Sequence, residues 1–192
     1  MGVIIDQKLN FNENTDKIMK NCLKKWSILK RFCKNANGSI FLKLYLTYIL
    51  PNIEYCNSIW KLNETHIKPI ESIQRKCTKF ICNKLCKYDY NYDMRCDALG
   101  LKTLDSRRKI KILCKVYSFI KSPHLVPNEL INCFEVYSNR NGLFIKMSKI
   151  RIKFCDKNFV LYGIELFNNL PMDIRNLDKF SLFKSHIIKY FN

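Results

Sequence analysis

The sequence predicts a mostly α-helical protein, made of a helical bundle with a short N-terminal strand, a small C-terminal β-hairpin and further helices. Three observations predict this class. Apolar residues recur at steps of three and four through several long segments, which is the spacing of one helix face. Only 5 glycines and 5 prolines occur in 192 residues, so few breaks interrupt these segments. Apolar residues make up 47% of the chain, which is enough to build a packed core.

The first elements are a strand and a long helix. Val3–Ile5 is a short β-branched run that favours a strand, although no partner strand is evident nearby. We expect Asn14 or Thr15 to cap a helix, because apolar residues recur at helical spacing from there as far as Phe32. Asn37-Gly38 is a typical helix end.

The next two predicted helices complete the N-terminal half. Ser39 is a candidate cap for a helix over Ile40–Leu50, which is apolar on nearly every side and is therefore expected to be central. Pro51 suits the first turn of a continuation of that helix. Thr65 can cap a third helix that extends to Leu85. Residues 88–98 are rich in tyrosine and aspartate, and we expect them to form a loop.

The C-terminal half combines helices with a hairpin. Thr103 is a candidate cap for a helix over Leu104–Ile120, and Pro123 should end it. A short helical candidate follows near 128–134. Alternation of apolar and basic residues within 143–155 predicts a hairpin with a basic face. Two closing helices are expected, at Phe159–Asn168 and Phe180–Phe191.

Three regions follow from these elements. Residues 1–12 hold the isolated strand, residues 13–98 form a helical domain, and residues 99–192 form an α+β region. No repeat and no low-complexity segment occurs, so the basic residues belong to ordinary amphipathic elements.

The charge balance points to a polyanionic partner. Lys and Arg number 34 against 16 Asp and Glu, for a formal net charge of +18. Such an excess opposes folding by self-repulsion and is typical of proteins that bind nucleic acid or an anionic membrane face. A solvated helix surface is the alternative that charge patterning alone leaves open. The candidate contact residues lie on polar helix faces: Lys17, Lys20, Lys24, Arg31, Lys68, Arg75, Lys76, Lys79, Arg107 and Arg108.

We expect no membrane-spanning helix, because the most apolar stretch, Ile40–Leu50, contains Lys43 and stops at Pro51. The N-terminus lacks the features of a secretory signal, so we expect a cytoplasmic or nuclear protein with reduced thiols.

The thiols are interpreted as core residues. Four of the 10 cysteines lie close together in sequence: Cys77, Cys82, Cys86 and Cys96. Their spacing matches no common zinc site, so no metal and no cofactor are expected.

No catalytic site is evident. The sequence has no glycine-rich phosphate loop, no Gly-x-Ser-x-Gly turn and no His-Glu-x-x-His helix. Its histidines are scattered. The acids that lie closest together in sequence are in the tyrosine-rich segment, where no flanking pair of strands is predicted to hold them in place. These residues are His66, His124, His186, Asp89, Asp93 and Asp97. We therefore assign no catalytic residue.

Several short motifs, taken in order, resemble a known enzyme family. They are Gly2-Val3-Ile4-Ile5-Asp6, Leu29-Lys30-Arg31-Phe32, Leu44-Tyr45-Leu46, Pro51-x-Ile53-Glu54-Tyr55-Cys56, Ile70-Glu71-x-Ile73-Gln74-Arg75, Leu99-Gly100-Leu101 with Arg107-Arg108, and Leu170-Pro171-x-x-Ile174-Arg175. Their order and spacing resemble the C-terminal part of a non-LTR, LINE-type (jockey-like) retrotransposon reverse transcriptase. The resemblance covers nearly the whole chain.

The resemblance implies a thumb-like helical bundle and a C-terminal region without the catalytic palm. The Tyr-x-Asp-Asp box of the family and its partner aspartate are absent from this chain, so Mg²⁺ would belong to the missing palm, and a palm and fingers polypeptide is a candidate partner. A truncated RNA-directed DNA polymerase of this kind would hold the backbone of an RNA or DNA template-primer without sequence preference. Two alternatives stay open: a basic module that docks on an acidic protein or an anionic membrane, and a pseudogene product without activity.

Overall fold

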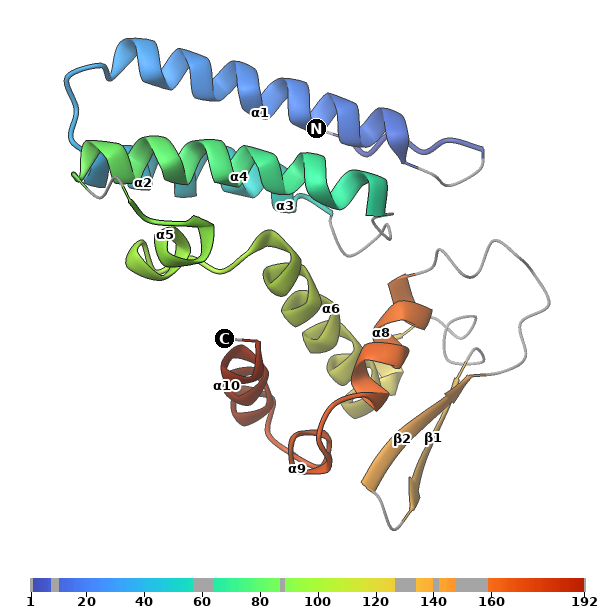
Figure 1. The fold of residues 1–192 in the computed structure, drawn as a ribbon. Helices are drawn as coiled ribbons and strands as arrows, with labels where there is room; N and C mark the ends of the chain where they lie inside the picture. Colours follow the sequence, from blue (N-terminus) through green and yellow to red (C-terminus); the bar gives the residue numbers. More distant parts are fainter. Residues whose placement is uncertain are drawn as a thin grey trace. The chain divides into compact units, whose positions relative to one another are not determined.

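The computed structural model describes residues 2–7, 11–56, 64–86, 89–126, 134–139, 142–147 and 159–191. The protein is mostly α-helical and has a short antiparallel hairpin, as the sequence predicts (Figure 1). The chain divides into two compact units. Unit 1 comprises residues 1–57 and 62–105, and unit 2 comprises residues 58–61 and 106–192.

Unit 1 is a bundle of helices. Helix α1 packs against α4, and the segment from α2 to α3 packs against both (Figure 1). The elements are α1 (Asn12–Phe32), α2 (Gly38–Leu44), the π-helical turn η1 (Tyr45–Ile49), α3 (Leu50–Glu54), α4 (Glu64–Lys84) and α5 (Tyr92–Ala98). Helices α2 and α3 continue one another through η1, with Pro51 in the first turn of α3 as expected.

Aromatic rings form the core between the helices of unit 1. Trp26 of α1, Phe41 of α2 and Phe80 of α4 meet edge to face, with ring centroids 4.8 to 5.8 Å apart. Trp26 and Phe41 are buried. Edge-to-face contacts suit the ring quadrupoles and add to the stabilisation that burial provides. This cluster holds α1 and α4 side by side.

A buried polar network joins α4 to its neighbours. The Tyr45 hydroxyl donates to Gln74 Oε1 at 2.7 Å. The Gln74 amide donates in turn to the Tyr92 hydroxyl at 2.9 Å and to the Lys102 carbonyl at 2.9 Å. Tyr92 donates to Glu71 Oε1, which also accepts the Leu104 backbone N–H at 3.2 Å. The network therefore links η1, α4, α5 and the start of the next helix.

Two predictions at the chain start are wrong. Residues 3–5 form no strand; instead the Ile4 N–H donates to Asn14 Oδ1 at 3.1 Å. A single extended segment without a partner strand cannot form a ladder, so a side chain satisfies its backbone. Helix α1 also begins before the expected caps, with Phe11 at its N-cap and Thr15 buried in the first turn.

Two further boundaries differ from the prediction. The residue that caps α2 is Asn37, whose side chain accepts the Ile40 N–H, and not Ser39. The expected loop over 88–98 contains α5, which is capped by Asn91 through the Met94 N–H. In both places an asparagine side chain supplies the acceptor that the first turn of a helix needs. Neither of these caps was predicted from the sequence.

The segment Ile40–Leu50, which the sequence predicts to be central because it is apolar on nearly every side, is buried on one side. Phe41, Tyr45 and Ile49 are fully buried, but Ile40 and Tyr48 are 45% and 52% exposed. The helix therefore lies at the edge of unit 1 and not at its centre. Its apolar outer residues cannot be distinguished from core residues by hydropathy alone.

Unit 2 is built around α6 (Leu104–Lys121), which begins in unit 1 and matches the predicted helix within one residue. Its other elements are η2 (Pro123–Leu125), β1 (Phe134–Asn139), β2 (Gly142–Met147), α8 (Phe159–Asn168), α9 (Met172–Arg175) and α10 (Phe180–Tyr190). Helix α8 approaches α6 closely, because a Cβ at Gly163 would lie 2.6 Å from Val116 Cγ2. The buried core includes Ile112, Leu113, Phe167 and Phe183.

The hairpin pairs different segments from those expected. Residues 142–147 form a strand, as predicted, but β2 pairs with β1 in an antiparallel register that runs from Phe134 opposite Met147 to Asn139 opposite Gly142. The predicted partner at 150–155 and most of the helical candidate at 128–134 lie outside the described residues. Phe134 itself begins β1. Periodicity detected the second strand but gave no information about its partner.

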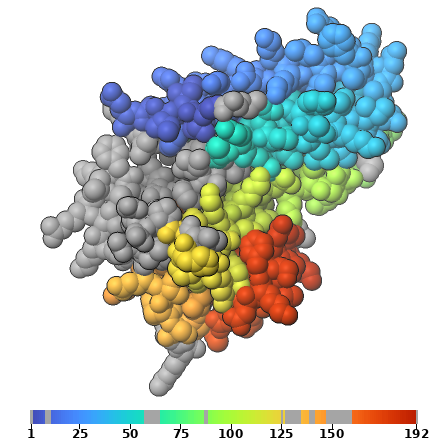
Figure 2. All heavy atoms as spheres, turned by 180° about the vertical axis from the view of Figure 1, so that it is seen from behind, coloured from blue at the N-terminus to red at the C-terminus, as the bar shows by residue number. Residues whose placement is uncertain are grey.

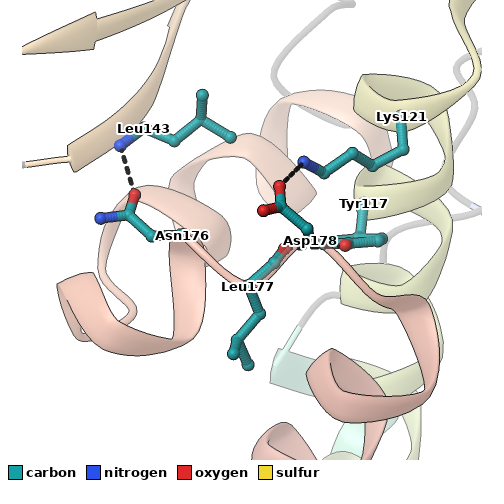
Figure 3. Close-up of polar contacts among 6 residues, drawn as sticks. All are labelled: Tyr117, Lys121, Leu143, Asn176, Leu177 and Asp178. Carbon is teal, nitrogen blue, oxygen red and sulfur yellow. Dashed lines mark hydrogen bonds and ion pairs between the residues drawn. The ribbon is translucent and has the colours of Figure 1, made fainter.

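Polar contacts hold the loop after α9 against its neighbours (Figure 3). The Tyr117 hydroxyl of α6 donates to the Leu177 carbonyl at 2.8 Å. The Leu143 N–H of β2 donates to Asn176 Oδ1 at 3.0 Å. Lys121 forms an ion pair with Asp178 at 2.8 Å. These contacts join α6 and the hairpin to one short loop.

Candidate nucleic-acid interface

Helix α1 presents a row of positive charge on its solvent face. Lys17, Lys20, Lys24 and Arg31 are exposed, and their spacing of three, four and seven residues places them on one side of the helix. The opposite side is packed, since Cys22 and Trp26 are buried. The packing of α1 thus leaves these four cations facing solvent, which agrees with the predicted amphipathic pattern.

Helix α4 repeats this arrangement. Lys68, Arg75, Lys76 and Lys79 are exposed. Its packed side is formed by residues that include Ile70, Ile73, Cys77 and Ile81, all of them buried. Unit 1 therefore carries two neighbouring helices that each combine an apolar face with a cationic face.

The two helices run side by side in the same direction (Figure 1). Near their C-terminal ends, the Lys84 ammonium donates to the Lys34 carbonyl at 2.9 Å. The ammonium groups of Lys30 and Lys84 lie 5.8 and 6.0 Å from the centroid of the Phe80 ring. Cations from both helices therefore flank the seam between α1 and α4, where both contact the Phe80 ring.

Arg75 has a second contact that distinguishes it from the lysines. Its guanidinium lies 4.4 Å from the centroid of the Tyr92 ring. Burial raises the pKa of the Tyr92 phenol well above its ordinary value, and the hydrogen bond to Glu71 raises it further. Arg75 thus packs against the polar network while remaining exposed, so its substitution would disturb both surface charge and packing.

The two arginines of α6 differ from the other candidates. Arg108 is only 5% exposed, and Arg107 is half-buried. A buried guanidinium cannot contact a phosphate in solvent, so Arg108 is excluded from the candidate interface. Both residues lie in unit 2. Sequence spacing placed them in a crowded run of cations but did not show which side of α6 packs.

Sequence reasoning about the site missed Glu71, Gln74 and Tyr92. They position the cationic face of α4, because the polar network of α4 anchors that helix to η1 and α5. The motif Ile70-Glu71-x-Ile73-Gln74-Arg75 contained the signal, since its polar residues at steps of three lie among buried apolar ones. Polar groups on a packed face indicate buried hydrogen bonds.

The cysteines of the predicted cluster do not converge. Cys77, Cys82 and Cys96 are buried, whereas Cys86 is exposed. Burial raises the pKa of the Cys77 thiol to about 12, which keeps it protonated at neutral pH. Across the described ranges, no group of three or more histidine, cysteine or acidic side chains is arranged to hold a metal ion.

The histidines and the acids of the tyrosine-rich segment lie on different elements. His66 is buried in α4, His124 is exposed after α6, and His186 Nδ1 lies 2.8 Å from the Leu182 carbonyl oxygen within α10. Asp93 and Asp97 are exposed on α5.

In the part of the chain that the structure describes, none of the helices is both long enough and apolar enough to cross a bilayer.

Comparisons with known proteins identify no family. No protein family and no solved structure matches the chain. An uncharacterized protein of Caenorhabditis elegans is 22% identical over 129 residues, which is 67% of this chain. The matched region spans 65% of the length of that relative.

Proposed function

We propose that unit 1 binds the sugar-phosphate backbone of nucleic acid without sequence preference. The observation that carries this proposal is the pair of cationic rows on α1 and α4, both opposite packed faces on neighbouring helices. Phosphate contacts made by lysine and arginine supply affinity that does not depend on base sequence. The formal net charge of +18 favours association with a polyanion over long distances.

The order of the sequence motifs supports a more specific origin for this activity. We infer that the chain corresponds to the C-terminal part of a LINE-type reverse transcriptase, an RNA-directed DNA polymerase whose catalytic palm is not included in this sequence. In this proposal the thumb-like unit 1 holds a template-primer, and the catalytic aspartates with their Mg²⁺ belong to the palm and fingers, outside this sequence. The chain by itself would bind nucleic acid without polymerising it.

A salt series tests the binding proposal. Fluorescence anisotropy with labelled duplexes of one length and unrelated sequences, from about 50 to 300 mM salt, measures affinity and its salt dependence. Each neutralised phosphate contributes a slope of about −0.9 to the plot of log affinity against log salt for duplex DNA. We expect a slope of about −4 or steeper and affinities that agree within about threefold among sequences.

Three outcomes would contradict the proposal. The first is no binding at the lowest salt, the second is a flat salt response, and the third is a strong preference for one sequence. Adding vesicles with and without anionic lipid separates the alternative of a membrane-docking module, because such a module would bind anionic vesicles more tightly than duplex.

A further inference from the structure

A second surface of unit 1 carries aromatic rings beside positive charge. On the segment from η1 to α3, Tyr48 lies in the π-helical turn η1, Asn52 lies in α3, and Tyr55 directly follows the end of α3. Tyr48 is 52% exposed and Tyr55 is 40% exposed.

Helix α1 forms the other side of this surface. Lys17, Ile18 and Asn21 of α1 line a pocket of about 30 Å³ together with Asn52 and Tyr55. One turn further along, the Lys25 ammonium donates to Asn52 Oδ1 at 3.0 Å. Figure 2 shows α1, in blue, lying along the light-blue to cyan segment that holds α2 and α3. We call this surface, lined by α1 and the η1–α3 segment, the α1–α3 groove.

The pocket in the groove is rich in hydrogen-bond donors. Asn14 also lines it and is 3% exposed. Because Asn14 Oδ1 accepts the Ile4 N–H, its Nδ2 must be the donor, and no acceptor for this atom is found among the described residues. The described pocket lining has the cation Lys17 and no carboxylate. Such a lining suits an oxygen acceptor that carries negative charge.

A third exposed ring lies on the same side of α1. Phe32 is seven residues after Lys25, hence on the same helix face, and it is 76% exposed. The Arg31 guanidinium lies 5.5 Å from the centroid of its ring. Phe32 therefore combines an exposed ring with a neighbouring cation, and Tyr55 lines a pocket with Lys17. An apolar core would normally cover rings of this size.

We propose that the α1–α3 groove binds a single strand of nucleic acid. Tyr48, Tyr55 and Phe32 stack on unpaired bases, while Lys17 and the pocket donors hold phosphate oxygens. Base stacking on aromatic side chains is tolerant of sequence and is worth about 1–3 kcal/mol per base. A paired base inside a duplex already has both faces stacked, so these rings select unpaired nucleotides. This inference rests on the proposed nucleic-acid binding by unit 1 and adds a preference for single-stranded segments.

The test compares two probes and two kinds of substitution. The probes are a labelled single-stranded oligothymidylate and a blunt duplex of the same length. The double variant Tyr48→Leu, Tyr55→Leu removes both rings and keeps apolar bulk. We expect its affinity for the single strand to fall at least tenfold and its affinity for the duplex to change less than threefold. The variant Tyr48→Phe, Tyr55→Phe keeps both ring faces and should retain affinity for the single strand.

The matched control is Tyr190→Leu, which removes a 50% exposed tyrosine from α10 of unit 2 and should alter neither affinity. The exposed position of Phe32 makes Phe32→Leu a second variant that does not depend on the fold of the η1–α3 segment. We expect it to weaken binding of the single strand by about fivefold or more, in line with the stacking energy of one base. Photocrosslinking of 4-thiothymidine oligonucleotides to the unaltered protein should map to residues 48–55.

The outcomes separate this inference from the function on which it rests. Failure of the unaltered protein to bind either probe at low salt would contradict both. Binding of both probes with no loss in the leucine variants, an equal loss for both probes, or crosslinks only outside the α1–α3 groove would overturn the single-strand inference and leave backbone binding standing.

Discussion

The two units use positive charge in different ways. In unit 1, the cations on α1 and α4 face solvent opposite packed faces. In unit 2, where Lys111 and Lys115 are also exposed, Arg175 takes part in internal contacts: it is 6% exposed, its guanidinium lies 3.9 Å from the centroid of the Phe144 ring, and it donates to the Leu143 carbonyl. Lys121 is paired with Asp178. A count of basic residues therefore indicates a partner for the whole chain, but packing decides which of these residues present their charge to it.

The polar contacts of the two units also differ in what they hold together. The network of unit 1 connects Glu71, Gln74 and Tyr92 around α4 and thereby fixes the helix that carries one cationic row. The polar contacts of unit 2 instead attach a loop to its neighbours through Tyr117 and Asn176 (Figure 3). In unit 1 buried polar groups support a surface, whereas in unit 2 partly buried and exposed polar contacts fix a loop.

Loss of the unit 1 network should have the largest effect on stability. Gln74→Leu keeps the size of the side chain and removes the partner of the Tyr45 hydroxyl and of the Lys102 carbonyl. We expect a loss of about 2–4 kcal/mol in the free energy of unfolding, because buried polar groups would be left without hydrogen bonds. Urea denaturation followed by circular dichroism measures it. Asn83→Leu at an exposed position of α4 is the matched control, and equal effects of the two substitutions would contradict this role of Gln74.

Removal of the buried guanidinium of Arg175 in unit 2 should have a smaller effect on stability and none on binding. Arg175→Met keeps an unbranched apolar stem but removes the guanidinium from the Phe144 ring and the Leu143 carbonyl. We expect a loss of about 1–3 kcal/mol and less than a twofold change in affinity for duplex. Lys179→Met, at an exposed position, controls for the charge. If Arg175→Met weakens nucleic-acid binding more than the control does, the contrast between the units is wrong.

The smallest expected effect concerns the ion pair on the surface of unit 2. The hydrogen bond and charge of Lys121 lower the pKa of the Asp178 carboxyl from its ordinary value of 3.8. A carboxyl whose pKa is lowered in the folded state stabilises that state above the pKa of the unfolded chain, and this contribution disappears as the pH falls through the folded value. Lys121→Met should return the pKa of Asp178 toward 3.8, as measured by carboxyl ¹³C NMR titration, and an unchanged pKa would exclude this pairing in solution.

Local patterns predicted the helices well because periodicity reports directly on packed faces. The bounds of α6 and α8 agree closely with the prediction, and the α1 and α4 cations are exposed as expected. The errors lie where partners distant in sequence decide the outcome. The partner of β2, the burial of Arg108 and the outward position of Tyr48 all depend on tertiary packing.

A comparison of two charge-matched variants tests the central claim most directly. One variant replaces four exposed lysines of unit 1 by glutamine, and the other replaces four exposed lysines of unit 2, so both lower the net charge equally. The unit 1 set avoids Arg75 because of its contact with Tyr92. The two sets are Lys20, Lys24, Lys68 and Lys79 in unit 1 and Lys111, Lys115, Lys184 and Lys189 in unit 2.

The measured quantity is the salt dependence of duplex affinity for each variant. If unit 1 holds the phosphates, the unit 1 variant should lose about 3 from the magnitude of the salt slope, since each lysine–phosphate contact contributes somewhat less than one. The unit 2 variant should lose less than about 1 on the same scale. An equal loss in the two variants would show that net charge alone drives binding and would contradict a phosphate-binding surface on α1 and α4.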